Sequence, residues 1–142
     1  MKQKLQLVVI DGQGGSLGKA LVSAIKKTYN QLEILGIGTN SLAASAMLKS
    51  GADAIATGEN PVLVACRSAD IIIGPLGIIT SDALHGEITP AMALAVAQSG
   101  AHKILIPISK CNVVIVGVQE TSLSVMIEYT LQEIARFLDS TA

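Results

Sequence analysis

Residues 5–18 read LQLVVIDGQGGSLG, and this stretch decides the fold. An apolar, β-rich run from Leu5 to Ile10 ends at a cluster of glycines, and apolar residues then recur at helical spacing from Ser16 to Thr28. The pattern predicts a strand, a tight turn and a helix. Glycines at such a turn let the backbone approach a phosphate, and the free N–H groups at the helix start favour its negative charge.

The rest of the chain repeats the alternation of strand and helix. Strands are predicted at 32–38, 54–57, 70–74 and 103–108, and helices begin near Ser41, Asn60, Thr89 and Ser122. Strands that alternate with helices form a parallel sheet covered on both faces. The chain is therefore expected to be one α/β domain, residues 1–142, with a Rossmann-like three-layer sandwich and strand order 3-2-1-4-5.

A sixth strand is predicted at Val113–Val118, where valines and an isoleucine follow one another. Only residues 109–112 separate it from the fifth strand, and a parallel crossover needs about a dozen residues. The sixth strand is therefore expected to run antiparallel at the edge of the sheet.

Composition limits the partners. Half of the residues are apolar and only 15% are charged. Either the core is unusually large or another subunit covers some apolar surface, and the second possibility predicts a homo-oligomer. The net charge is -1, without a basic run or an aromatic platform, which argues against polymeric nucleic acid as a partner.

Neither a membrane span nor a signal peptide is predicted. Gln6 and Asp11 interrupt the first apolar run too early for a signal peptide, and no apolar stretch approaches the roughly 20 residues that cross a bilayer. A cytoplasmic protein is expected.

The glycine-rich turn is the first candidate for ligand contact. Gly12, Gly15 and Gly18 fit the spacing G-x-x-G-x-x-G, which resembles the fingerprint of extended and atypical short-chain dehydrogenases and reductases. A phosphate is expected against the amides of Gly14 to Leu17. The alternative is a tight turn that serves packing alone. The predicted binding residues of this segment are Asp11, Gly12, Gln13, Gly14, Gly15, Ser16, Leu17 and Gly18.

Two features depart from NAD-binding domains. The carboxylate of Asp11 would repel a bare phosphate unless it binds a metal ion, a ribose hydroxyl or a backbone amide. After the second strand, where such domains place an acidic residue for the ribose, this chain has Thr39 and Asn40. These side chains could bind a ribose or a 2′-phosphate, or only cap the next helix. NAD(P) and other nucleotides stay open as cofactors, so the partner predicted is a small phosphate-bearing molecule.

The loop from Pro75 to Thr89 is the second candidate. Strand order reverses between strands 1 and 4, and ligands of open α/β sheets bind at such a point. Gly74, Pro75, Gly77, His85 and Glu87 are therefore expected near the ligand, although an exposed loop with solvated charges would read the same way. Lys110 and Cys111 follow strand 5 on the same edge, and their roles stay open.

No catalytic motif is recognisable. Reductases of the resembled type use Tyr-x-x-x-Lys, whereas Tyr29 is followed four residues later by Glu33, and Tyr129 by Glu133. A binding or sensing module without catalysis is therefore preferred. The alternatives are a small enzyme with Asp11, His85 or Glu87 as acid or base, and a subunit of a larger assembly.

Four fragments carry a further resemblance: VIDGQGG (9–15), GPLG (74–77), GEITPAMA (86–93) and IPISKCN (106–112). Together they resemble a family of small bacterial proteins that is known as a domain of unknown function. The resemblance implies a Rossmann-like fold and no particular activity.

Overall fold

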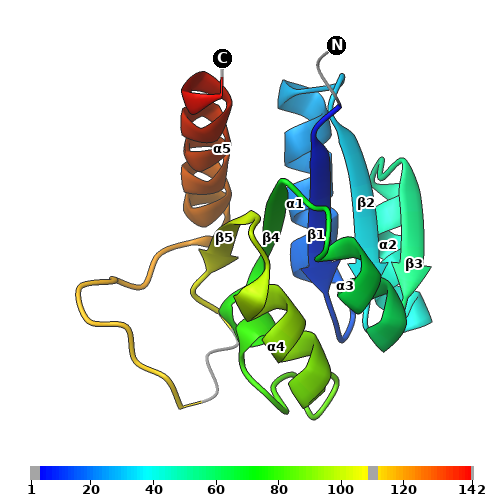
Figure 1. Cartoon of the computed structure of the whole chain (residues 1–142). Coiled ribbons are helices and arrows are strands. Elements are labelled where there is room, and N and C mark those ends of the chain that lie inside the picture. The colour runs from blue at the N-terminus through cyan, green and yellow to red at the C-terminus, as the bar shows by residue number, and fades with distance from the viewer. Residues whose placement is uncertain (1–3, 109–111, 142) are drawn as a thin grey trace.

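The computed structural model describes residues 4–108 and 112–141. Its centre is a sheet of five parallel strands in the order β3-β2-β1-β4-β5, which confirms the predicted α/β fold and strand order (Figure 1). In the register, Leu7 of β1 lies opposite Ile34 of β2 on one side and Ile71 of β4 on the other. The strands are β1 (Gln6–Asp11), β2 (Glu33–Gly38), β3 (Ala54–Thr57), β4 (Ile71–Pro75) and β5 (His102–Ile106).

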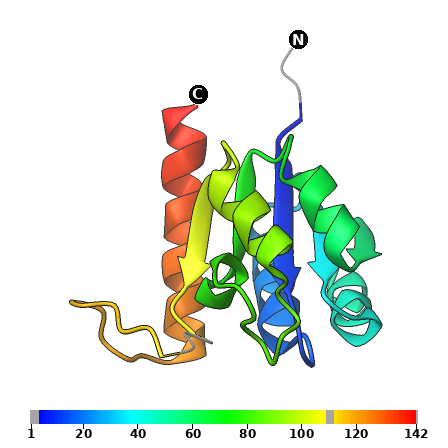
Figure 2. The ribbon, with the colours of Figure 1, turned by 60° about the horizontal axis from the view of Figure 1, so that its bottom comes forward.

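Helices cover both faces of the sheet (Figure 2). One face carries α1 (Ser16–Thr28), α2 (Ser41–Lys49) and α5 (Leu123–Ser140). The other carries α3 (Glu59–Ala65), the short 3-10 helix η1 (Leu76–Ile79) and α4 (Pro90–Gln98). Among these helices, none combines the length and the apolar character needed to cross a membrane.

Two apolar layers hold the sandwich together, one on each side of the sheet. Leu7 and Val9 of β1 point into the layer under α1, whereas Val8 and Ile10 point into the layer under α4. All five residues of β4 are buried, as expected for a central parallel strand covered on both faces. The apolar alternation along β1 therefore fixes which helices lie on which face.

The prediction of a sixth strand is wrong for the described residues. Residues 113–118 form no strand, and the segment extends away from the sheet (Figures 1 and 2). The fifth strand also ends earlier than predicted, at Ile106, because Pro107 lacks an N–H group and cannot continue the ladder. A strand needs a neighbouring strand as well as β-branched residues, and residues 113–118 have no neighbouring strand among the described residues. Lys110 and Cys111 lie outside the described residues.

Candidate functional site

The glycine-rich turn joins β1 to α1 at the carboxyl edge of the sheet. Gly15 stands directly before α1 with φ at +77°, and a Cβ atom there would lie 2.8 Å from the Cα of Ala43 in α2. The turn is closed by a hydrogen bond from the N–H of Gly15 to the carbonyl of Gly12, 3.0 Å long. Gly15 is therefore required both by its left-handed conformation and by the approach of α2.

Three N–H groups of this turn are available to a ligand. Those of Gly14, Ser16 and Leu17 donate to no protein group among the described residues. The first N–H groups of a helix have no partner within the helix, and the helix dipole makes this end attractive to anions. The turn can thus bind an anionic oxygen without breaking a bond of its own.

Asp11 lies beneath the turn and fastens it to the helix. Its side chain is buried, and Oδ2 accepts a hydrogen bond of 2.6 Å from the N–H of Gly18. Burial raises the pKa of Asp11 above its ordinary value, although the N–H groups of Gly18 and Gly12 act in the opposite direction. Of the three partners considered for this carboxylate from the sequence, a backbone amide is the one observed.

Glu87 reaches from the loop after β4 to the glycine-rich turn and to the end of β2. Its Oε1 accepts hydrogen bonds of 2.7 Å from the N–H of Gln13 and 2.5 Å from the hydroxyl of Thr39. The amide nitrogen of Asn40 lies 3.4 Å from Oε1 and 3.3 Å from Oε2. One carboxylate therefore connects three segments that are far apart in the sequence.

The ionisation of Glu87 follows from these bonds. Burial acts to raise its pKa, but the hydrogen bonds from Thr39, Gln13 and Asn40, together with the charge of His85, outweigh it and hold the pKa below its ordinary value. Glu87 is therefore a carboxylate at neutral pH, suited to accept hydrogen bonds.

The backbone of the loop sets the direction in which Glu87 projects. Asp82, Leu84, His85 and Gly86 all have positive φ angles, and the N–H of Asp82 donates to the carbonyl of Ile88 over 2.7 Å. These tight turns bury Leu84 against the glycine-rich turn, where its Cδ1 would lie 2.9 Å from a Cβ atom at Gly12. His85 is exposed.

The predicted residues separate into two groups. The turn from Asp11 to Gly18 meets Thr39, Asn40 and Glu87 at one edge of the sheet. The predicted residues at the end of β4 and in η1 are internal: Gly74 packs against the carbonyl of Ile10, Pro75 is the last residue of β4 and Gly77 is buried in η1.

Asn40 caps α2, which is one of the two roles that the sequence left open, and it also contacts the glycine-rich turn. Its Oδ1 caps α2 by accepting a hydrogen bond of 2.9 Å from the N–H of Ala43. Its amide nitrogen donates to the carbonyl of Gln13, also over 2.9 Å. The residue that caps α2 therefore also contacts the glycine-rich turn.

The sequence did not predict that Glu87 contacts the end of β2. The sequence shows no acidic residue after the second strand, yet the structure has a carboxylate there that comes from another loop. The only signal was an acidic residue in the longest connection of the chain, and nothing local indicated that it reaches β2.

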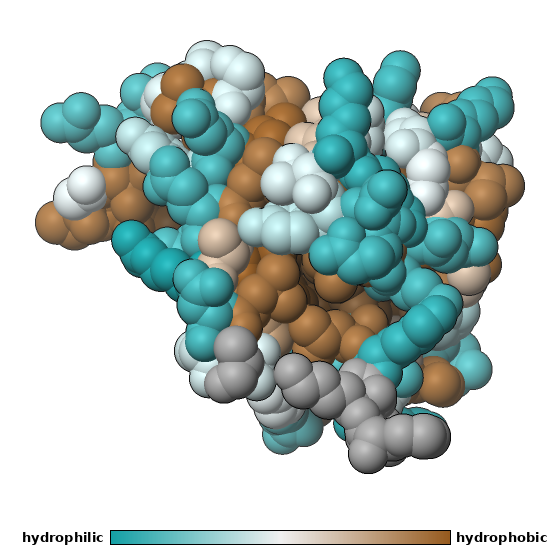
Figure 3. All heavy atoms as spheres, turned by 90° about the horizontal axis from the view of Figure 1, so that it is seen from above, coloured by the Kyte–Doolittle hydropathy of each residue, from teal (hydrophilic) through white to brown (hydrophobic). Residues whose placement is uncertain are grey.

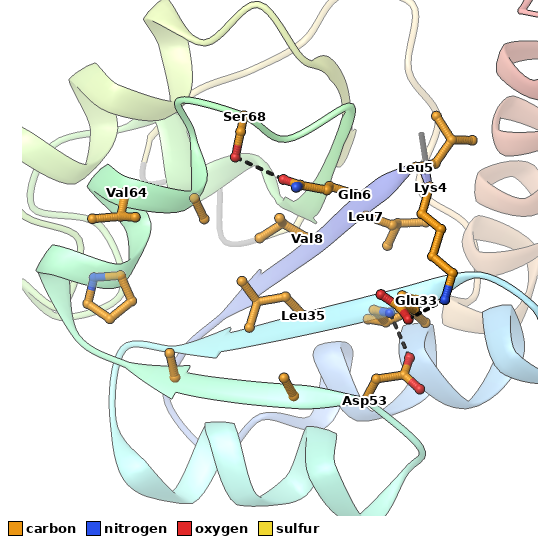
Figure 4. A pocket seen from close by; sticks show the side chains of 15 residues that line it. Lys4, Leu5, Gln6, Leu7, Val8, Glu33, Leu35, Asp53, Val64 and Ser68 are labelled. Atoms are coloured by element: carbon orange, nitrogen blue, oxygen red, sulfur yellow. Dashed lines mark hydrogen bonds and ion pairs between the residues drawn. The ribbon is translucent and has the colours of Figure 1, made fainter. Parts of the chain in front are cut away.

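A second hollow lies at the opposite, amino end of the strands and was also missed. Because α3 spans only seven residues, it leaves part of the sheet face uncovered beside β2 and β3. The hollow has a volume of about 550 Å³, and Figure 4 shows Val8, Leu35 and Val64 around it. Figure 3 shows apolar surface, in brown, sunk among hydrophilic side chains at this end of the molecule.

Polar groups of this second hollow are engaged with one another. Lys4 and Glu33 form an ion pair of 2.7 Å, and the hydroxyl of Ser68 donates to Oε1 of Gln6 over 2.8 Å (Figure 4). Asp53 pairs with Lys26, whose hydrogen bond is the main reason that the pKa of Asp53 lies below its ordinary value. Specific ligand sites have polar groups that converge on the ligand, so the carboxyl edge is the better candidate.

Comparison with known proteins gives the family of the chain. Residues 6–139 match the family model described as Domain of unknown function (DUF3842). A solved structure entitled as a dodecameric FMN-dependent UbiX-like decarboxylase from Escherichia coli O157:H7 is similar, with 19% identity and a TM-score of 0.44 over 93% of this chain and 75% of that one. No curated protein matches the chain.

Proposed function

We propose that this chain, which belongs to the DUF3842 family, binds a small molecule with a phosphate and neighbouring hydroxyl groups at the carboxyl edge of the sheet, where the glycine-rich turn, the end of β2 and the loop after β4 meet. The ligand class that fits is a nucleotide or dinucleotide. The observation that carries the proposal is the carboxylate of Glu87, held between the glycine-rich turn and the end of β2.

The hydroxyl groups of the ligand are assigned to Glu87. In dinucleotide-binding domains, a carboxylate at the end of the second strand takes the ribose hydroxyls. Glu87 offers the same chemistry there from a different part of the chain. Its Oε1 is already anchored, whereas Oε2 has a single long contact of 3.3 Å with Asn40 and retains capacity to accept.

The phosphate is assigned to the glycine-rich turn. The N–H groups of Gly14, Ser16 and Leu17 face no protein acceptor among the described residues, and the dipole of α1 adds to their attraction for an anion. The phosphate and hydroxyl groups would then be bound at adjacent parts of one site, as their spacing in a nucleotide requires.

Among the three acid or base candidates, Glu87 alone suits a direct role in the proposed site. Asp11 is buried and bound to the N–H of Gly18, and His85 lies exposed on the loop. With its lowered pKa, Glu87 would act as a hydrogen-bond acceptor or a base. Binding without catalysis stays the preferred function.

Calorimetric titration tests the phosphate contact. The probes are AMP, ADP, NAD, NADP, coenzyme A and FMN, titrated into the wild type, Gly14→Asp and Gly14→Asn. A side chain at Gly14 meets nothing within 4 Å, so both variants should fold, and they differ in charge alone. We expect at least one probe to bind, with an affinity that falls by more than tenfold in Gly14→Asp and far less in Gly14→Asn, about 1.4 kcal/mol per factor of ten. Absence of binding by every probe, or equal loss in both variants, contradicts the proposal.

The hydroxyl contact has its own test. AMP and 2′,3′-dideoxy-AMP are compared on the wild type and on Glu87→Gln. The wild type should prefer AMP by about tenfold or more, since an acceptor left without its hydroxyl costs about 1–3 kcal/mol. Glu87→Gln should lose most of that preference. Equal binding of the two nucleotides by the wild type would remove Glu87 from the proposal.

A further inference from the structure

The segment 112–118, here called the valine arm, is an unpartnered strand-forming sequence. Val114 is 84% exposed and Val116 94% exposed, and Val113 and Val118 are exposed as well. The arm stands off the body of the molecule in both ribbon views (Figures 1 and 2). Within the described residues its backbone makes one hydrogen bond, a turn from the N–H of Val118 to the carbonyl of Ile115, 3.3 Å long.

Strand β5 is the matching element, because one of its edges is open. It pairs with β4, and the described residues supply no strand on its other side. A hollow of about 540 Å³ lies beside this edge, and it is lined by Ile104 and Ile106 of β5, by Met126 and Tyr129 of α5, and by Gly117 and Val118 at the end of the arm. The other edge strand of the sheet, β3, has only four residues and offers a shorter ladder.

The exposed apolar area points to a second copy of the chain as the partner. The four valines, with Leu123 and Tyr129 of α5, are between 39% and 94% exposed. Monomers rarely expose so many apolar side chains next to one another, and such patches commonly mark an interface with another protein chain. Residues 112–119 carry no charged side chain, so two copies would not repel one another there.

We infer that two copies exchange their valine arms, so that residues 113–118 of one copy pair antiparallel with β5 of the other. The same chain has an unpaired arm and an unpaired edge of β5. In a dimer with a two-fold axis, each arm pairs with the β5 edge of the other copy, so both arms and both edges gain a partner. The exchange also covers an open sheet edge, which otherwise invites aggregation.

Measurements of molecular mass and of amide hydrogen exchange together test whether two copies swap their arms. Analytical ultracentrifugation of the wild type should give twice the chain mass of 14.6 kDa, and Val116→Asp should give a monomer. The matched control is Leu94→Asp, because Leu94 is 56% exposed on α4, away from the arm, and this variant should stay dimeric. Both variants alter exposed side chains, and circular dichroism checks that they fold.

Amide exchange then locates the interface. The arm and β5 should exchange slowly in the wild-type dimer, and the arm should become rapidly exchanging in Val116→Asp. A wild type that is monomeric at all concentrations, a mass above two copies, a dimeric Val116→Asp or a dimer whose arm exchanges freely would each overturn the inference.

Discussion

Glu87 is the residue on which the arrangement of the carboxyl edge depends. It accepts hydrogen bonds from the turn after β1 and from the end of β2, while its own loop follows β4. Hydrogen bonds to a charged acceptor each contribute about 1.5–3 kcal/mol when buried. Glu87 is only half-buried, so a smaller contribution is expected.

Glu87→Gln should therefore destabilise the protein by about 1 kcal/mol at pH 7, since a neutral acceptor binds the same donors more weakly. The pKa of Glu87 is lower in the folded protein than its ordinary value of 4.5. Its contribution to stability is thus complete above about pH 4.5 and is lost as the pH falls through the folded pKa. Urea denaturation of both proteins at several pH values should show the difference closing on acidification. The raised pKa of Asp11 changes stability with pH in the opposite direction, but Asp11 is present in both proteins and so cancels in the comparison. A stability difference that does not change with pH would contradict this account.

Gly12 leaves no room for a side chain below the carboxylate of Glu87. A Cβ atom there would lie 2.6 Å from Oε1 of Glu87 and 2.6 Å from Oγ1 of Thr39. Gly12→Ala should force these two side chains apart and cost about 1–3 kcal/mol of unfolding free energy. Gly14→Ala is the control, since Gly14 faces open space and should change stability little. Thermal or urea unfolding decides, and equal effects of the two variants would argue against the contact.

The site was only partly predictable from the sequence. Contacts between residues close in the chain could be predicted, whereas contacts between distant residues could not. The turn from Asp11 to Gly18 is local, so the glycine spacing between a strand and a helix indicates it directly. The partner of Thr39 is 48 residues away. Which loop reaches the end of β2 depends on the positive φ angles between Asp82 and Gly86, and three of these four residues are not glycine.

At the scale of the elements, helix starts were predicted well because each is encoded in a few adjacent residues. Thr89 precedes Pro90, and its hydroxyl accepts the N–H of Met92 over 3.1 Å, as a cap residue should. The hydroxyl also donates to Glu59 of α3 over 2.5 Å. The cap of α4 thus links two helices on the same face of the sheet.

Thr89→Ala should cost about 1 kcal/mol, the usual effect of losing a helix cap, with a small addition for the lost bond to Glu59. Thr89→Ser keeps the hydroxyl and should retain most of the stability. Chemical denaturation of the two variants provides the comparison. If Thr89→Ser were as unstable as Thr89→Ala, the cap would not be the cause.

Strands were predictable where the sheet supplies a neighbouring strand. The apolar run Ile71–Ile73 has strands on both sides and helices on both faces, so its sequence alone indicates a central strand. The run at Val113–Val118 has equal strand propensity, but propensity cannot supply a neighbour. The strand predicted at Val113–Val118 does not form because a strand needs a neighbour, which the local sequence does not determine.

For the whole molecule, protection against hydrogen exchange should fall from the centre of the sheet toward β3. Strands β1 and β4 have neighbours on both sides and buried side chains, whereas each residue of β3 is partly or fully exposed. Amides of β1 and β4 should exchange only with global unfolding, and those of β3 should open locally and faster. Mass spectrometry of exchange under native conditions measures this. Equal protection of β1 and β3 would show that the sheet opens as one unit.

The buried carboxylate of Asp11 beneath the glycine-rich turn has a consequence for the charge state of any ligand. Although the N–H of Gly18 is bonded to Asp11, any charge on Asp11 would add to that of Glu87 near the proposed phosphate position, and burial raises the pKa of Asp11. A terminal phosphate monoester carries about -1.5 to -2 at pH 7, whereas a phosphate esterified on both sides carries a single negative charge. The proposed site should therefore discriminate by ligand charge, favouring internal diester or pyrophosphate linkages over terminal phosphates. NAD should bind more tightly than NADP, and the gap should narrow as salt screens the repulsion.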